Sequence, residues 1–159
     1  MVVSAWKDLN CSIARSLDVL GERWTLLVVR EACFGRTRFS EFRDALGVAP
    51  DVLSDRLATL VEVGVLERRP YREDGGRRRE EYVLTPAGDD LRLVLAALQA
   101  WGDQHRPARE DRGARFVEAA TGEPVTTSFV AADGRRLEPG EVLAVRPVRR
   151  PPSPVVAPV

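Results

Sequence analysis

The sequence contains few histidines, few cysteines and no long apolar runs, and each of these features excludes a class of protein. One histidine and two cysteines cannot supply the four ligands of a structural zinc site, and two thiols do not form the disulfide framework of a small secreted domain. Apolar runs such as Leu26–Val29 are far too short to cross a bilayer, and the first residues lack a secretory signal pattern. We therefore expect a cytoplasmic protein with no membrane anchor and no metal.

The chain also has no net charge at pH 7, although 30% of its residues are charged. It is therefore not a polycation, and any contact with nucleic acid must come from a local patch. Lys7 is the only lysine among the 24 basic residues, and the others are arginines. A genome rich in G and C explains this bias, but arginine also makes bidentate contacts with phosphate and guanine that lysine cannot make.

Sequence signatures of enzymes are missing: there is no Gly-rich phosphate loop, no nucleophile elbow and no cluster of metal ligands. The only histidine, His105, falls at the end of a predicted helix, where a surface residue is expected instead of a catalytic base. We therefore predict that the protein is not an enzyme and has no cofactor.

Apolar residues spaced at three and four predict two helices near the start of the chain. The first covers residues 12–20, with Ile13, Leu17 and Leu20 on one face. The second, residues 24–34, is apolar on nearly all sides, which is typical of a helix at the centre of a domain.

Two short helices joined by a tight turn follow. Ser40 is a suitable N-cap for a helix over residues 41–46, and Gly47 can end that helix. Pro50 suits the first turn of the next helix, which Gly64 can stop. The apolar stripe of this second helix is Leu53, Leu57, Leu60 and Val61. The pair forms a candidate helix-turn-helix.

Two β-prone segments, VLERRPY and EEYVLT, flank a charged connector with a Gly-Gly turn, which predicts a hairpin with an exposed tip. Thr85 then caps a long helix that runs to about His105. The apolar positions of this helix are Leu91, Val94, Leu95, Leu98 and Trp101.

This order of elements predicts a winged helix-turn-helix, mainly α with a small β-hairpin wing and therefore of the α+β class. We assign residues 1–106 to this DNA-binding and dimerisation domain. Residues 107–147 form a short β-like C-terminal extension. The Pro-rich tail, 148–159, is expected to be disordered.

The chain resembles the HxlR-type transcriptional regulators over roughly residues 8–105. The resemblance rests on Cys11 with IARSLDVLGERWTLLVVRE shortly after it, on RFSEFRDAL and VLSDRLATLVEVGVLERR, and on the wing end EEYVLTPAG. It implies a dimeric bacterial DNA-binding regulator whose N-terminal and long C-terminal helices build the dimer interface. It also implies that a cysteine at the position of Cys11 responds to oxidants, electrophiles or aromatic compounds.

The sequence departs from the family pattern in three places. Ser12 follows the cysteine where proline is common, and Cys33 is not a family hallmark. Some relatives carry paired cysteines resembling a zinc ribbon in the extension, where FVAADGRRLEPGEV has alanines and Asp133. We therefore assign no metal to this segment.

The exposed face of the predicted recognition helix is acidic. At about 100° per residue, the face opposite the apolar stripe presents Asp51, Asp55, Ala58, Thr59 and Glu62. The N-terminal end of such a helix normally contacts bases, and the candidates there are Pro50, Asp51, Ser54 and Asp55. Asp51 could accept a hydrogen bond from cytosine N4, or it could only complement the helix dipole; both readings stay open.

Affinity for DNA must then come from arginines outside that helix. Candidates for contacts to phosphates or a minor groove are Arg38 and Ser40 at the start of the motif and Arg72, Arg77, Arg78 and Arg79 in the wing. An arginine run alone is usually a solvated hairpin face. Because this run follows a helix-turn-helix in the sequence, neutralisation of the DNA backbone becomes the favoured interpretation.

One recognition helix reads only a few base pairs, so we predict a homodimer on an inverted repeat in double-stranded DNA. The stripe from Leu91 to Trp101 is the expected dimer surface, and intramolecular packing is its alternative use. The predicted function is a transcriptional repressor, switched by thiol modification or by a small aromatic or electrophilic ligand. The alternative, which the neutral charge and acidic helix face keep open, is a protein-interaction module that does not bind DNA.

Cys11 is the candidate redox sensor. It lies near the N-terminus of the first predicted helix, where the dipole favours a thiolate, and Arg15 adds positive charge one turn on. Its alternative role is to pack as a small apolar residue, which we also expect of Cys33. Trp6, Trp24 and Trp101 are candidate walls of an aromatic ligand site or, equally, plain core residues.

Overall fold

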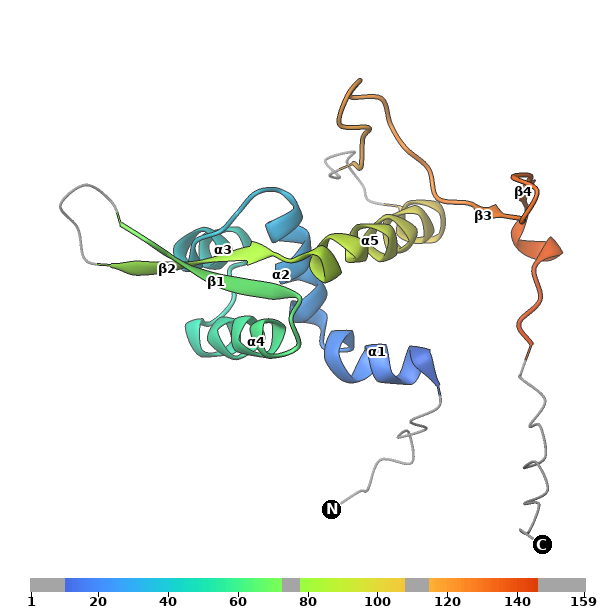
Figure 1. Cartoon of the computed structure of the whole chain (residues 1–159). Helices are drawn as coiled ribbons and strands as arrows, with labels where there is room; N and C mark the ends of the chain where they lie inside the picture. The colour runs from blue at the N-terminus through green and yellow to red at the C-terminus, as the bar shows by residue number, and fades with distance from the viewer. Residues whose placement is uncertain (1–10, 73–77, 108–114, 146–159) are drawn as a thin grey trace, which may run out of the picture. The chain divides into compact units, whose positions relative to one another are not determined.

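The computed structural model describes residues 11–72, 78–107 and 115–145, and the chain forms two compact units, Met1–Val125 and Thr126–Val159 (Figure 1). The elements of the first unit are α1 (Ser12–Leu20), α2 (Arg23–Cys33), α3 (Phe39–Leu46), α4 (Pro50–Glu62), β1 (Leu66–Tyr71), β2 (Arg79–Leu84) and α5 (Pro86–His105). Strands β1 and β2 pair antiparallel. The predicted order is confirmed, and the fold is a winged helix-turn-helix, mainly α with a small β-hairpin.

Helix α2 is the centre of the first unit, as its apolar sequence predicts. It packs against α1, α3, α4, α5 and β2, and its Val28 and Val29 are completely buried. The large side chains from the neighbouring elements that are also fully buried are Phe42, Leu53, Leu57, Leu60 and Leu66. Burial of one such side chain contributes about 1.5–3 kcal/mol, so this cluster holds the two helices of the motif in place.

Two predicted helix boundaries are confirmed by the backbone. Gly47 ends α3 with a left-handed φ of 60°, a conformation that glycine adopts without strain. At the start of α5, the Thr85 hydroxyl accepts a hydrogen bond from the Gly88 N–H at 3.2 Å and donates one to the Gly64 carbonyl at 2.6 Å. Thr85 therefore caps the long helix and also ties it to the end of the helix-turn-helix.

The prediction that Ser40 caps α3 is wrong. The helix begins at Phe39, and Ser40 lies exposed in its first turn. The cap comes from the Glu41 carboxylate, which accepts hydrogen bonds from the backbone N–H groups of Arg38 and Thr37, each at 2.9 Å. These bonds, that of Arg38 first, lower the pKa of Glu41. Their stabilising effect is therefore present above the pKa of an unfolded glutamate and is lost as the pH falls through the folded-state pKa.

Gly88 leaves no room for a side chain where α5 meets the hairpin. A Cβ atom there would lie 2.3 Å from the Val65 carbonyl oxygen and 2.8 Å from Leu84 Cδ2. Overpacking of this kind costs about 1–3 kcal/mol, so we expect Gly88→Ala to lower the free energy of unfolding in urea by that amount. Gly102→Ala is the matched control on the same helix, because a Cβ there meets nothing within 4 Å. Equal stability of the two variants would contradict the packing described here.

The second unit holds a small sheet of β3 (Phe129–Val130) and β4 (Arg136–Leu137), followed by a short 3-10 helix, η1 (Pro139–Glu141). Gly134 turns the chain between the strands with a left-handed φ of 85°. The β-like runs predicted for this part of the chain are therefore present. Residues 115–125 belong to the first unit, where Phe116 packs against the core, and the division at residue 106 stays a prediction.

None of the helices within the described ranges has the length and apolar character needed to span a membrane. Nor do those ranges contain a group of three or more side chains able to hold a metal ion. The tail predicted to be disordered, residues 148–159, lies outside the described residues.

Candidate nucleic-acid interface

Helix α4 presents its N-terminal end to solvent. Its inward stripe, Leu53, Leu57 and Leu60, is fully buried, which turns the opposite face outward. The four predicted base-contacting residues of this end are all exposed: Pro50, Asp51, Ser54 and Asp55. Pro50 is the first residue of the helix, because its fixed φ and missing N–H suit that position. The exposed end is acidic, as predicted, so it can discriminate bases but does not attract phosphates.

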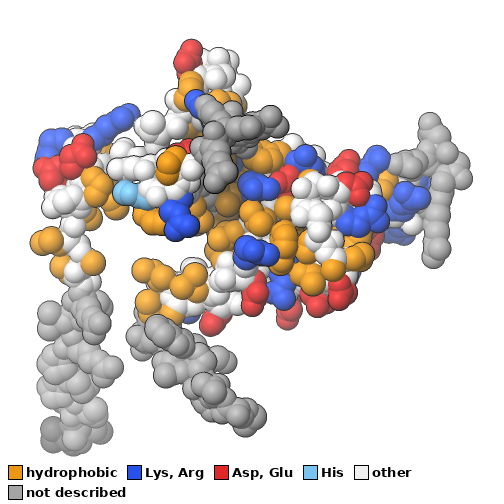
Figure 2. All heavy atoms as spheres, turned by 180° about the vertical axis from the view of Figure 1, so that it is seen from behind, with side chains coloured by type: hydrophobic (Ala, Val, Ile, Leu, Met, Phe, Trp, Pro, Cys, Tyr) orange, Lys and Arg blue, Asp and Glu red, His pale blue; other side chains and the backbone are white. Residues whose placement is uncertain are grey.

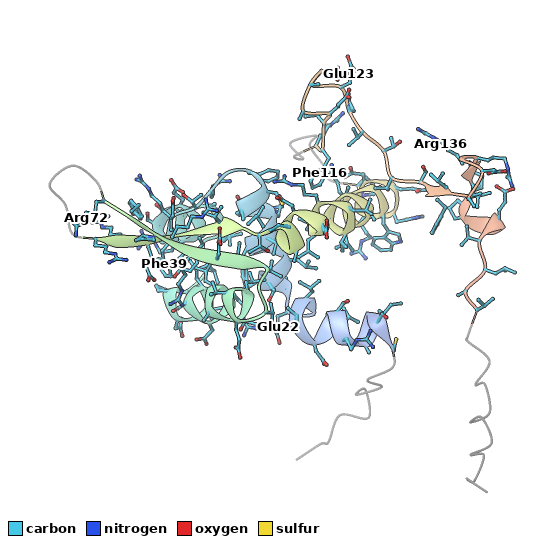
Figure 3. The ribbon with its side chains drawn as sticks, in the orientation of Figure 1. Glu22, Phe39, Arg72, Phe116, Glu123 and Arg136 are labelled. Carbon is cyan, nitrogen blue, oxygen red and sulfur yellow. The ribbon has the colours of Figure 1, made fainter. Side chains whose placement is uncertain are left out.

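The wing supplies the positive charge that α4 lacks. Within the strands, Arg69 Nε donates to Glu67 Oε1 at 2.8 Å, and Arg68 lies 3.8 Å from Glu80. Beyond these pairs, the predicted phosphate-contacting residues Arg72, Arg78 and Arg79 are exposed toward the hairpin end. Figure 3 shows Arg72 at that end, and basic side chains gather there in Figure 2. Arg77 lies outside the described residues.

Arg38 ties the start of α3 to the wing. Its guanidinium carbon lies 4.8 Å from the centre of the Tyr71 ring, a cation–π contact. Backbone contacts also join the start of α3 to β2. Arg38 forms a β-bridge with Glu81, and the Tyr82 N–H donates to the Thr37 carbonyl at 2.7 Å. The helix-turn-helix and the hairpin therefore form one surface.

A buried ion pair that sequence reasoning missed lies behind this surface. Glu31 is 4% exposed at the end of α2, and both Arg30 and Arg36 pair with its carboxylate. Arg36 precedes α3, so the pair fixes the loop that leads into the motif. The available signal was a single glutamate in a mostly apolar helix, directly after Arg30 and five positions before Arg36.

One part of the apolar stripe predicted for dimerisation packs into the core, and the other part is exposed. Leu95 is buried in the core, and Leu91 packs against it. Val94, Leu98 and Trp101 are exposed, Trp101 to 59%. Helix α1 carries two more exposed apolar residues, Ile13 and Leu17. The first and last helices of the unit therefore both offer apolar surface that the described part of the chain does not cover.

The two cysteines have different surroundings. Cys11 is the N-cap residue of α1, half-buried, and its carbonyl accepts from the Arg15 N–H at 3.1 Å. The Arg15 guanidinium donates to the Ser12 hydroxyl at 3.0 Å. Cys33 is the last residue of α2, and burial raises the pKa of its thiol, although Arg92 acts in the opposite direction. Both thiols are free. The raised pKa lowers the thiolate fraction of Cys33 at neutral pH, as expected of a packing residue.

Of the candidate tryptophan walls, Trp24 is half-buried against the core, and Trp101 lies beside His105 with ring centres 5.3 Å apart. Trp6 lies outside the described residues.

Known proteins resemble this chain in sequence and in structure. The family model of the HxlR-like helix-turn-helix matches residues 19–110. An HTH-type transcriptional regulator of Mycobacterium tuberculosis, Rv3095, is 38% identical over 143 residues, which are 90% of this chain and 86% of that protein.

Two solved structures extend the comparison. The crystal structure of PA1607, a candidate transcription factor, is 38% identical, covers 89% of this chain and 98% of its own, and gives a TM-score of 0.76. The redox regulator HypR in its reduced form is 27% identical, covers 60% of this chain and 94% of its own, and gives a TM-score of 0.55. With an exposed recognition helix beside an arginine-bearing wing, the chain belongs to the HxlR-like helix-turn-helix family and is a DNA-binding transcriptional regulator.

Proposed function

We propose that the protein represses transcription by binding, as a homodimer, to an inverted repeat in double-stranded DNA. The observation that carries this proposal is the joined surface of α4 and the wing, held together by Arg38 and Tyr71. In this arrangement Pro50, Asp51, Ser54 and Asp55 meet the bases, and the arginines around them neutralise phosphates. A dimer on a promoter excludes RNA polymerase, and this action on the chromosome takes place in the cytoplasm.

The exposed apolar residues of α1 and α5 support dimerisation. A second copy that covers the exposed stripe of Val94, Leu98 and Trp101 removes apolar surface from water, which lowers the free energy and favours the dimer. We place the DNA-binding and dimerisation functions in residues 1–106, and we treat residues 107–147 as an extension.

A thiol switch at Cys11 is the proposed input. The residue starts α1, one of the two helices with exposed apolar surface, so an added group on its sulfur would alter the spacing of the two recognition helices. The similarity to the redox regulator HypR supports a redox input. A small aromatic or electrophilic effector is the other proposed input.

We expect diamide together with glutathione to weaken DNA binding by the wild-type protein at least about tenfold. The Cys11 thiolate and a glutathione thiol form a mixed disulfide, while diamide takes up the two electrons and two protons and becomes the hydrazine. Cys11→Ser should abolish that loss because it has no thiol at this position. The measurement is electrophoretic retardation of the DNA upstream of the protein's own gene, with and without oxidant. Cys33→Ser is the matched control and should keep the wild-type response. Equal oxidant sensitivity of the wild type and Cys11→Ser would remove Cys11 as the sensor.

The acidic face of α4 favours one competing function, a winged helix that binds a protein partner without reading DNA. Retardation of the upstream DNA against a shuffled sequence of equal length separates the two. Specific retardation of the upstream DNA is expected. Equal affinity for both sequences, or none for either, would favour the partner-binding function.

A further inference from the structure

A pocket of about 740 Å³ lies between α2 and α5. One wall is a stripe of α2 that includes Leu26 and Leu27, continued by Phe34, the C-cap residue of this helix. The facing wall is a stripe of α5 that includes Leu95 and Leu98. The volume lies within the range of about 300–1,000 Å³ that is typical of small-molecule sites. The pocket is therefore large enough for a ligand of one or two rings.

Phe116 closes one side of this pocket. It lies beside α5 in Figure 3 and packs against the core. Its carbonyl accepts from the Val125 N–H at 3.1 Å, and Val117 bridges Pro124, so a small hairpin holds it. Together with Phe34 at the C-cap of α2, it gives the pocket two aromatic side chains against which a flat apolar ligand can pack.

The charges along the pocket favour an anion. Three arginines and two acids line it: Arg23, Arg30, Arg36, Glu31 and Asp103. Arg30 and Arg36 both pair with Glu31. Arg23 has no carboxylate partner within the part of the chain that the structure describes, and its guanidinium lies 4.6 Å from the centre of the Trp24 ring. A ligand carboxylate could therefore bind Arg23 without breaking an existing pair.

We propose that this pocket binds a small aromatic carboxylate, whose rings pack between Phe34 and Phe116 and whose carboxylate binds Arg23. The pocket reaches Ala45 of α3 and Arg36 before it, and also Leu98 of the exposed stripe of α5. A ligand in the pocket therefore lies next to both the helix-turn-helix motif and the proposed dimer surface. The regulatory consequence rests on the proposed function, whereas the binding site itself does not.

The binding test uses the full chain and isothermal titration calorimetry with 2-naphthoate and its neutral analogue 2-naphthamide. We expect one naphthoate per chain and at least about tenfold weaker binding of the amide, because a charge-assisted hydrogen bond is lost. Arg23→Gln should weaken naphthoate binding by about the same factor and leave the amide unchanged. Leu27→Trp, which fills the pocket, should abolish both.

Arg92→Gln is the matched control, since Arg92 is an exposed arginine of α5 that does not line the pocket. Circular dichroism and thermal melts establish that each variant is folded. The absence of naphthoate binding, equal binding of the acid and the amide, or binding unaffected by both Arg23→Gln and Leu27→Trp would each overturn the site.

Retardation of the upstream DNA with and without naphthoate then tests the consequence. We expect at least a threefold change in DNA affinity for the wild type and none for Leu27→Trp. If naphthoate binds but no DNA is retarded, the proposed function fails and the ligand site stands. If DNA is retarded but naphthoate does not bind, the ligand site fails and the proposed function stands.

Discussion

Replacing Leu98 and Trp101 together by glutamate is expected to turn a dimer into a monomer and to lower operator affinity by about 10²–10⁴-fold. The two side chains are 50% and 59% exposed, so the substitution puts charge into the proposed interface while sparing the core. Loss of the second half-site removes the gain in effective concentration that a linked pair of recognition helices provides. Sedimentation at micromolar protein and fluorescence anisotropy with labelled operator DNA measure the two effects.

A control with the same change in charge separates dimerisation from electrostatics. Ala100 and Gln104 are exposed positions of α5 that lie outside the angular range of the stripe, and the double variant Ala100→Glu, Gln104→Glu should stay dimeric. Thermal melts should show that both double variants are folded. A wild type that sediments as a monomer, or a Leu98 and Trp101 variant that remains dimeric, would refute the interface.

Replacing Arg77, Arg78 and Arg79 by alanine is expected to weaken binding to every DNA sequence and to flatten its dependence on salt. Arg78 and Arg79 are exposed at the hairpin, beyond the arginines that pair with Glu67 and Glu80. Each lost phosphate contact should reduce the slope of log K against log salt by about 0.9, so the triple variant should lose about 2.7 per protomer and about 5.4 for the bound dimer. Titrations at several salt concentrations, with operator and shuffled DNA, give both quantities.

The matched control removes three arginines elsewhere: Arg92, Arg135 and Arg136. Each is exposed and lies outside the motif and the wing. This variant has the same net charge as the wing variant and should keep the wild-type slope. If the wing variant binds like the wild type at low and moderate salt, the wing does not contact DNA.

Local signals in the sequence predicted the order of elements because each depends on neighbouring residues alone. The stripe of α4, the turn at Gly47 and the cap at Thr85 are examples, and the structure confirms each. The start of α3 was predicted wrongly because a side chain three residues beyond the cap, Glu41, supplies the oxygen that Ser40 was expected to supply.

Contacts between distant residues could not be predicted in the same way. The contact of Arg38 with Tyr71 joins positions far apart in the chain, and it depends on how the hairpin folds back on α3. Helical spacing places Leu95 and Leu98 in one apolar stripe, but it does not say that the first faces the core and the second faces solvent. The pocket between α2 and α5 depends on the same packing, so neither its position nor its volume could be predicted from the spacing of the residues that line it.

Hydroxyl-radical footprinting of the protein on the DNA upstream of its own gene tests the central claim most directly. A dimer that places one α4 helix in each of two major grooves should protect two segments related by a dyad, with centres about one helical turn apart. The Leu98 and Trp101 double variant should lose both protected segments together. A single protected segment, or protection without dyad symmetry, would contradict the account of a dimeric regulator on an inverted repeat.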